Sequence, residues 1–239
     1  MAHLHFDHVT IQYPIYNSRT QSVRHQLMAI GTGGRLGRDG SKVTTVTALS
    51  DVSFHLTDGD RVGLIGHNGA GKTTLLRTMA GIYPPAGGTI RREGRTSTII
   101  EVGSGMDVEL SGYENIRRMG LLLGLSQAEI DRVLPDIEAF TDLGDYLHMP
   151  VRIYSSGMTT RLMFAVATAS RPEILLVDEM LGAGDADFQK RAEQRMTDLI
   201  HAASIFVFAS HSHDLIRRFC KRVFRLEHGT LTEVPLDSL

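Results

Sequence analysis

The chain has 239 residues, which is enough for one large domain or two small ones. Its composition is that of an ordinary globular protein, and a formal net charge of -2 leaves no overall basic footprint for nucleic acid. The single cysteine, Cys220, excludes an internal disulfide framework and fits a reducing compartment. No apolar run approaches the ~20 residues of a membrane-spanning helix, and the first ten residues lack the apolar core of a secretory signal. We therefore expect a cytoplasmic protein that reaches a membrane only through a partner.

The first predicted element is a strand, because apolar residues alternate imperfectly through Leu4, Phe6, Val9 and Ile11. Residues 17–42 then change in composition: they hold five basic residues against one acid and end in a glycine-rich run. The spacing of Val23, Leu27 and Ile30 predicts a short amphipathic helix within them. We interpret 17–42 as a basic insertion between two edge strands.

The next elements are a short apolar strand, Arg61–Ile65, and a helix, Lys72–Ala80, separated by glycines. Two capping boxes then predict helix starts, and the pattern stays mostly helical to about residue 170; the pairs are Ser111 with Glu114 and Ser126 with Glu129.

Compact apolar runs return at Ile174–Val177 and Ile205–Phe208, as in buried parallel strands. The last elements are Arg222–Leu226 and Thr230–Val234, with a turn at Gly229 between them. The order predicts one α/β domain over 1–239, with a helical subdomain inserted at about 103–170 and an antiparallel β edge.

The strongest motif fits the pattern G-x-x-x-x-G-K-[ST], and its phosphate-binding run extends to Thr74: Gly66, His67, Asn68, Gly69, Ala70, Gly71, Lys72, Thr73 and Thr74. The glycines allow backbone N–H groups to surround phosphate oxygens at the start of a helix. Lys72 supplies a charge to the β and γ phosphates, and the Thr73 hydroxyl can hold Mg²⁺. The alternative is a glycine-rich turn with an exposed lysine. By itself the motif predicts a P-loop NTPase core that binds a nucleoside triphosphate and Mg²⁺.

The second motif is the apolar run from Ile174 that ends in Asp178 and Glu179. Such a run places its acids at the carboxyl edge of a parallel sheet, where ligands bind. Asp178 would hold Mg²⁺, directly or through water, and Glu179 would act as general base toward the attacking water. Without a phosphate loop upstream, the run would be an ordinary strand end.

With these motifs in place, the chain resembles the nucleotide-binding subunit of an ABC transporter. Residues Tyr154–Met158 stand where that family carries its L-S-G-G-Q signature, and they open a helix expected at Thr159–Ala169. The resemblance implies that Ser155, Ser156 and Gly157 grip the γ-phosphate bound by a second, head-to-tail copy of the chain. Read alone, the same residues are only a helix cap.

Further family positions follow from the resemblance. Asp185 fits the aspartate that lines the dimer interface, and His211 fits the switch histidine at the γ-phosphate, with His213 as its competitor. Tyr13 fits the aromatic residue that stacks on adenine, and Tyr16 is the alternative.

One position departs from the family pattern, since Glu101 stands where most relatives have a glutamine that senses Mg²⁺ and the attacking water. An acid there would bind Mg²⁺ or compete with Glu179. This stretch and Glu109–Ile116 resemble the polysaccharide-export ATPases, which move lipid-linked O antigen, capsular polysaccharide or teichoic acid.

The resemblance therefore implies an ATP hydrolase that exports lipid-linked polysaccharide, with O antigen favoured and capsule or teichoic acid as alternatives. Its partners would be a second copy and a polytopic permease, without nucleic acid, at the cytoplasmic face of the bacterial inner membrane. The 17–42 insertion would face the permease or anionic lipids, or else be a solvated loop. No carbohydrate-binding domain is expected after Gly229. Non-transport regulatory ATPases and nucleotide kinases share the phosphate loop but fit the remaining motifs less well.

Overall fold

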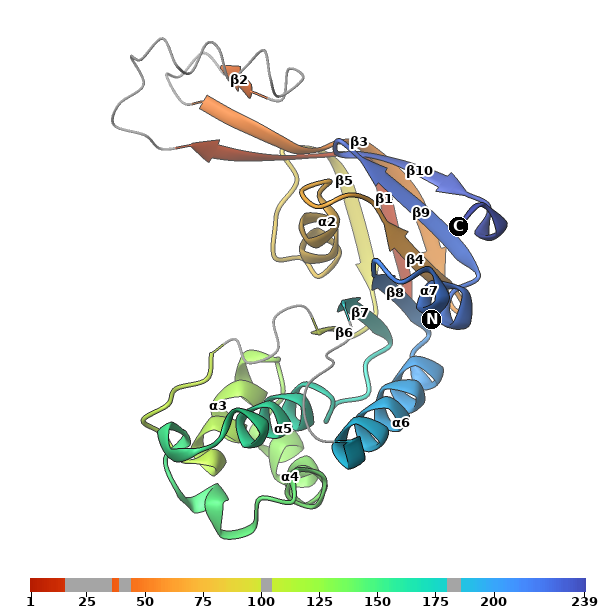
Figure 1. Cartoon of the computed structure of the whole chain (residues 1–239). Coiled ribbons are helices and arrows are strands. Elements are labelled where there is room, and N and C mark those ends of the chain that lie inside the picture. Colours follow the sequence, from red (N-terminus) through yellow and green to blue (C-terminus); the bar gives the residue numbers. More distant parts are fainter. Residues whose placement is uncertain (16–35, 39–43, 100–104, 180–185) are drawn as a thin grey trace. The chain divides into compact units, whose positions relative to one another are not determined.

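The computed structural model describes residues 1–15, 36–38, 44–99, 105–179 and 186–239 (Figure 1). The expected helix at 23–30, Tyr16, Glu101 and Asp185 lie outside these residues. The chain forms two compact units, which are described separately: unit 1 comprises 1–93 and 207–239, and unit 2 comprises 94–206. Unit 1 is thus built from two separate stretches of sequence.

Unit 1 contains a four-stranded antiparallel sheet in the order β2-β3-β1-β5. The strands are β1 (His3–Ile15), β2 (Leu36–Arg38), β3 (Thr44–Thr57) and β5 (Gly87–Glu93). Since β1 pairs with both β3 and β5, and β3 pairs with both β1 and β2, the expectation of edge strands around the insertion is wrong. Both flanking strands are interior strands of this sheet.

A β-bulge at His8 explains the imperfect alternation of β1. His8 has a φ of 51°, and the pairing with β3 shifts between Phe6 and Val9. The buried face therefore passes from even to odd positions, so that Phe6 and Val9 are both buried. On β3, Asp51 also has a positive φ, and its Oδ1 lies 2.6 Å from Nδ1 of His8. This hydrogen bond raises the pKa of His8.

The second sheet of unit 1 has the strand order β10-β9-β4-β8. Its elements are β4 (Arg61–Ile65), β8 (Ile205–Ala209, which begins in unit 2), β9 (Arg222–Glu227) and β10 (Thr230–Val234). Helices α2 (Lys72–Met79) and α7 (His213–Phe219) and the 3-10 turn Leu236–Ser238 complete the unit. The β4–β9 pair is parallel, and the ring of Phe54 in β3 lies 5.5 Å from that of Phe224 in β9.

Unit 2 has a parallel pair, β6 (Thr96–Ile99) and β7 (Ile174–Asp178), and four α-helices among its described residues. The helices are α3 (Gly112–Leu122), α4 (Gln127–Thr141), α5 (Ser156–Ala167) and α6 (Ala186–Ala202), with 3-10 turns at Gly144–His148 and Val151–Ile153.

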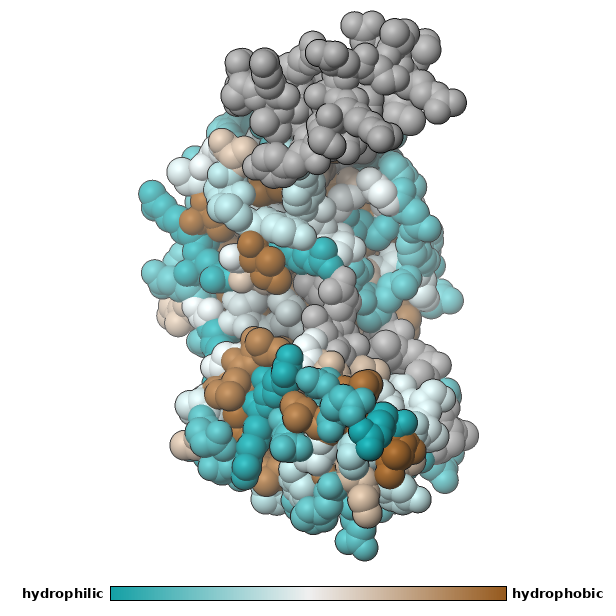
Figure 2. All heavy atoms as spheres, turned by 90° about the vertical axis from the view of Figure 1, so that its left-hand side faces the viewer, coloured by the Kyte–Doolittle hydropathy of each residue, from teal (hydrophilic) through white to brown (hydrophobic). Residues whose placement is uncertain are grey.

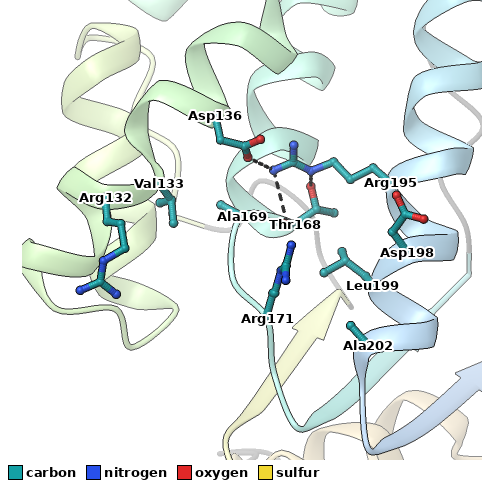
Figure 3. A pocket seen from close by; sticks show the side chains of 10 residues that line it. All are labelled: Arg132, Val133, Asp136, Thr168, Ala169, Arg171, Arg195, Asp198, Leu199 and Ala202. Carbon is teal, nitrogen blue, oxygen red and sulfur yellow. Dashed lines mark hydrogen bonds and ion pairs between the residues drawn. The ribbon is translucent and has the colours of Figure 1, made fainter.

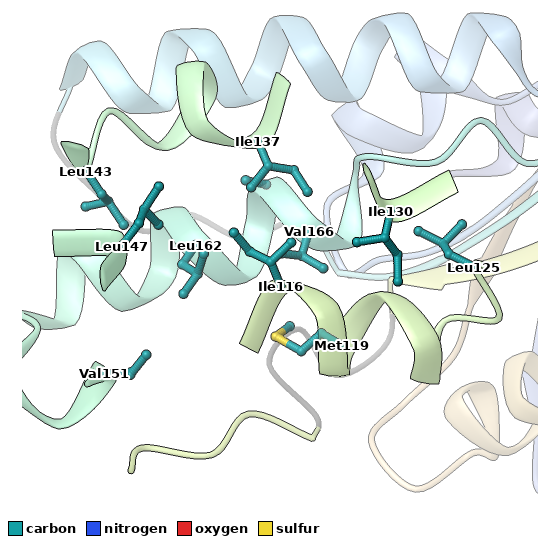
Figure 4. Close-up of a cluster of buried hydrophobic side chains, with 11 residues drawn as sticks. Ile116, Met119, Leu125, Ile130, Ile137, Leu143, Leu147, Val151, Leu162 and Val166 are labelled. Carbon is teal, nitrogen blue, oxygen red and sulfur yellow. The ribbon is translucent and has the colours of Figure 1, made fainter. Parts of the chain in front are cut away.

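The helices α3, α4 and α5 share a hydrophobic core between residues 116 and 166 (Figure 4). Ile116 and Met119 enter it from α3, Ile130 and Ile137 from α4, and Leu162 from α5. In α3 and α4 these positions recur at helical spacing, so each of the two helices buries one face and exposes the other, whereas α5 is buried or half-buried at every position after Ser156.

Both predicted capping boxes are present. Ser111 and Ser126 each accept a hydrogen bond from the backbone N–H three residues later, and Glu114 and Glu129 each accept one from the backbone N–H of the cap serine. Helix α5 begins three residues before the expected Thr159, because the hydroxyl of Ser155 caps it by accepting from the N–H of Met158.

No helix in the described part of the chain is long and apolar enough to cross a bilayer. Unit 2 nevertheless exposes several large side chains with apolar surface: Val108, Leu121, Leu122, Tyr146, Met149 and Ile153. Figure 2 shows brown hydrophobic areas among teal polar ones on one face of the molecule.

Candidate functional site

The glycine-rich loop between β4 and α2 has the backbone shape of an anion cradle. Gly66, Gly69 and Gly71 have φ values of 155°, 79° and 111°, which side-chain-bearing residues rarely adopt. Nζ of Lys72 lies 2.6 Å from the Gly66 carbonyl oxygen and 3.3 Å from that of His67, so the ammonium group spans the loop. No side chain caps the start of α2 within the described residues. The first N–H groups of the helix can therefore donate to an anion.

The β9–β10 turn supports this loop through backbone hydrogen bonds. The N–H of Gly229 donates to the carbonyl of Ala70 at 3.2 Å, and the Gly229 carbonyl accepts from the N–H of Ser50 at 2.9 Å. A Cβ atom on Gly66 would lie 2.3 Å from the carbonyl oxygen of Leu226, so only glycine fits there. The turn thus fixes the loop against β3 and β9.

Two histidines share a cavity of about 310 Å³ with the phosphate loop; its lining includes Gly66, His67, His211, His213, Arg225 and Glu227. Ser210 is buried, and Ser212 caps α7 by accepting from the N–H of Leu215. This cap places His211 before the helix and His213 at its first position, both exposed. Both His211 and His213 line the same cavity as the phosphate loop, so the structure does not distinguish which of them is the switch histidine.

Tyr13 lies beside the first turn of α2. Its hydroxyl donates to Oγ1 of Thr74 at 3.2 Å, and its ring contacts Tyr83. Burial raises the pKa of Tyr13, so the phenol remains a hydrogen-bond donor at neutral pH. The half-buried ring is held at the edge of the phosphate loop.

In unit 2, Asp178 is the last residue of β7 and Glu179 follows it. Asp178 is half-buried, whereas Glu179 is exposed and has a φ of 58°. A left-handed conformation costs a residue with a side chain about 1–2 kcal/mol. Such strain is concentrated at functional sites, where the surrounding structure imposes it.

The signature-like residues of unit 2 form the start of α5. Ser155 and Ser156 are exposed and Gly157 is half-buried. A Cβ atom on Gly157 would meet only the hydroxyl of Ser155, at 3.8 Å. Ser155 and Ser156 at this helix start are therefore accessible to an anion, whereas the N–H of Met158 donates to the hydroxyl of Ser155.

Comparison with known proteins decides the family. A family model described as ABC transporter matches residues 49–182, more than half of the chain. The chain belongs to the ABC transporter family.

Relatives within the ABC family include proteins named for polysaccharide export. The chain is 61% identical over its full length, and over all of the relative, to the O-antigen export system ATP-binding protein RfbE of Yersinia enterocolitica. It is 36% identical over 97% of its length to RfbB of Klebsiella pneumoniae, of which it covers 92%. It is 35% identical over 96% of its length to the teichoic acids export ATP-binding protein TagH of Listeria monocytogenes, of which it covers 65%.

Solved ABC structures share the fold. The ATP-binding subunit of an ABC transporter matches 98% of the chain, and the match covers 90% of that structure, with a TM-score of 0.69 and 22% identity. A dimeric ATP-binding cassette in a post-hydrolysis state matches 98% of both chains, with a TM-score of 0.67 and 18% identity. The α/β P-loop NTPase fold of ABC type and the expected activity of an ATP hydrolase are thus confirmed.

Each unit offers an oxygen ligand of the kind that magnesium prefers. Thr73 in unit 1 carries a hydroxyl, and Asp178 in unit 2 carries a carboxylate. Among the described residues no three histidine, cysteine or acidic side chains gather into a metal site. Mg²⁺ at nucleotide sites usually takes one or two protein ligands together with phosphate oxygens and water, so a cluster of three such side chains is not required for it.

Unit 2 holds a second cavity of about 540 Å³ between α4, the end of α5 and α6 (Figure 3). Arg195 joins these elements: its Nε donates to Oγ1 of Thr168 at 2.8 Å, and its Nη2 lies 2.5 Å from Oδ2 of Asp136. The guanidinium carbon is 4.4 Å from the ring centroid of Phe140. We interpret Arg195 as a structural clamp between helices.

Sequence reasoning missed two supports of the phosphate loop. The His228–Gly229 turn was recognisable as a turn, but its contact with Ala70 depends on the parallel pairing of β4 with β9. Tyr83 carried no motif signal, because an isolated aromatic residue after a helix is usually a packing residue.

Proposed function

We propose that this chain is the ATP-hydrolysing subunit of an exporter of lipid-linked polysaccharide, with O antigen as its cargo, at the bacterial inner membrane. The supporting observation is the 61% identity to an O-antigen export ATP-binding protein over the full length of both chains. The phosphate loop and its supports supply the nucleotide site that such a subunit needs.

In the proposed mechanism, the N–H groups of the 66–71 loop and Lys72 bind the triphosphate of ATP. Thr73 and Asp178 would hold Mg²⁺, and the bound ion would neutralise charge on the phosphates. Glu179 accepts a proton from the attacking water, and His211, or else His213, donates a hydrogen bond to the γ-phosphate. The phosphoryl group passes to water, leaving ADP and phosphate.

The proposed site is completed by a second copy of the chain. Ser155, Ser156 and Gly157 of one copy would bind the γ-phosphate held by the other. Asp185 would line the interface, and Glu101 would act near Mg²⁺ in place of the usual glutamine. Closure of the two copies on ATP would move a polytopic permease, and exposed apolar residues of unit 2 such as Leu122 and Ile153 offer it a contact surface.

The test of this mechanism is Glu179→Gln. Removing the general base should lower ATP turnover at least about 100-fold, because a positioned base contributes about that much or more. In cells that lack the native gene, wild-type protein should restore surface O antigen and Glu179→Gln should not. Turnover is measured by phosphate release, and O antigen by gel analysis of lipopolysaccharide.

The matched control is Glu93→Gln, which neutralises an exposed carboxylate on β5. It should retain both turnover and export. Unaltered hydrolysis by Glu179→Gln would contradict the assignment of the base. If the wild-type protein hydrolysed ATP but did not restore surface O antigen in cells that lack the native gene, the result would contradict the proposed cargo.

A second candidate cargo is teichoic acid or capsular polysaccharide, favoured by the 35% identity to a teichoic acids export protein. The same complementation separates the candidates, because loss of the subunit should trap its own lipid-linked glycan inside the cell. Extraction and composition analysis of the trapped glycan would identify it.

A further inference from the structure

Tyr83 packs against Tyr13 in unit 1. Their ring centroids lie 5.3 Å apart with an interplanar angle of 83°, an edge-to-face pair. A T-shaped pair of this kind is favoured by the ring quadrupoles, and it covers at most one of the two faces of Tyr13. One face of Tyr13 is thereby left clear of Tyr83.

The backbone around Tyr83 is fixed at both ends. At the end of α2, the N–H of Ile82 donates to the carbonyl of Arg77 and that of Gly81 to the carbonyl of Thr78, a Schellman motif with Gly81 at a φ of 79°. Three residues after Tyr83, the N–H of Ala86 donates to the carbonyl of Thr10 in β1.

The side chain of Tyr83 is also fixed. Nη1 of Arg77, in the last turn of α2, donates to the Tyr83 hydroxyl at 3.1 Å. The guanidinium carbon of Arg77 lies 6.0 Å from the centroid of the Tyr83 ring. Two prolines, Pro84 and Pro85, follow and restrict φ in the connection to β5. The Tyr83 ring that contacts Tyr13 is therefore part of a rigid support.

The ring of Tyr13 is consequently held at two points: its hydroxyl by Thr74 and its ring by Tyr83. A free tyrosine ring rotates about two side-chain torsions, and stacking on a base would cost that freedom. Holding the ring in advance removes this cost from nucleotide binding.

We propose that Tyr83 is a positioning residue that sets the ring of Tyr13 for stacking on the adenine of ATP. The inference rests on the proposed function, which assigns adenine stacking to Tyr13. The inference adds Tyr83, a residue outside the sequence motifs, to the proposed ATP site. Its role is limited to the binding of ligands that carry a base. If Tyr83 merely packed against the end of α2, its loss would affect ligands with and without a base equally.

The experiment compares binding of ATP with binding of inorganic tripolyphosphate by calorimetry, in EDTA so that no hydrolysis occurs. The contribution of the base is measured by a ratio: the dissociation constant for tripolyphosphate divided by the dissociation constant for ATP. Tyr13→Ala should lower this ratio about tenfold, the usual value of one stacked base. Tyr83→Leu should lower it at least about threefold with tripolyphosphate binding unchanged, and Tyr83→Phe, which keeps the ring edge, should stay within about twofold of wild type.

Tyr146→Leu, which changes an exposed tyrosine of unit 2, is the control and should leave the ratio unchanged. Should Tyr83→Leu not melt cooperatively, Tyr83→Met keeps apolar bulk without an aromatic edge and takes its place. A ratio lowered by Tyr13→Ala but unchanged by Tyr83→Leu and Tyr83→Met would overturn the role of Tyr83 alone. A ratio unchanged by Tyr13→Ala would overturn the assignment of Tyr13 and the inference with it.

Discussion

At the residue scale, backbone conformation separates Glu179 from an ordinary acid at a strand end. Its φ of 58° places a charged side chain in a region that glycine normally occupies. No sequence pattern predicts this conformation, because neither Glu179 here nor His8 at the β1 bulge is a residue typical of a tight turn. The motif predicted the position of the acid, whereas the backbone conformation that orients it depends on the surrounding fold.

We expect Glu179→Gly to stabilise the protein and to abolish turnover. Relief of the left-handed conformation gains about 1–2 kcal/mol, and the greater freedom of glycine in the unfolded chain offsets about 0.5–1 kcal/mol. The net gain in the free energy of unfolding should be about 0.5–1 kcal/mol, measured by urea denaturation. Glu179→Gln keeps the side chain and should show no such gain; an equal or lower stability for Glu179→Gly would argue against stored strain.

At the element scale, the sequence predicted helices and strands whose existence depends on local patterns, such as side-chain caps. It did not predict the bounds of strands that are held by pairing with residues far away in the sequence. Both capping boxes and the buried strands at 174 and 205 followed from local patterns. The full length of β3, Thr44–Thr57, did not, because only Val52, Phe54 and Leu56 alternate regularly with polar residues, and the rest of the strand is held by pairing with β1. The start of α5 was misplaced by three residues, because Ser156, Gly157 and Met158 were assigned to the cap and instead form the first turn of the helix.

Ser126→Ala should destabilise the protein by about 1 kcal/mol, the usual cost of losing a serine N-cap. The box lowers the pKa of Glu129 to about 2, chiefly through its hydrogen bonds with Ser126 and then with Arg95. The ionised Glu129 therefore contributes stability above its unfolded pKa, near 4.5, and this contribution is lost as pH falls toward 2. Thermal melts at pH 7 and pH 3 should show a smaller effect of Ser126→Ala at pH 3. Ser126→Thr should restore most of the loss; an effect that does not depend on pH would contradict the coupling.

At the scale of the whole molecule, the candidate catalytic groups are divided between the two units. The phosphate loop and both candidate histidines belong to unit 1, whereas Glu179 and the signature-like residues belong to unit 2. The sequence predicted that Ser155–Gly157 lie in a helical subdomain at about 103–170, but it did not predict that Glu179 belongs to the same unit. The proposed second copy then supplies Ser155–Gly157 to complete each site.

With Glu179→Gln as background, ATP and Mg²⁺ should convert the protein to a dimer in size-exclusion chromatography with light scattering. Adding Ser155→Asp should prevent this, because aspartate still caps α5 but places a negative charge against the γ-phosphate of the other copy. Ser126→Asp makes the same change at the cap of α4 and should leave the dimer intact. Persistence of the dimer in the Ser155→Asp protein would contradict a role for this helix start in binding ATP.

The support of the phosphate loop by the β9–β10 turn also has a consequence for biosynthesis. The ribosome makes the loop at 66–74 early, then all of unit 2, and only afterwards Leu226 and Gly229, which hold the loop in shape. Unit 2 can thus fold while unit 1 is still waiting for its second stretch of chain. A nascent chain therefore lacks a formed nucleotide site until residues 226–229 have been made, so it cannot consume ATP or close on a second copy while the loop is still unsupported.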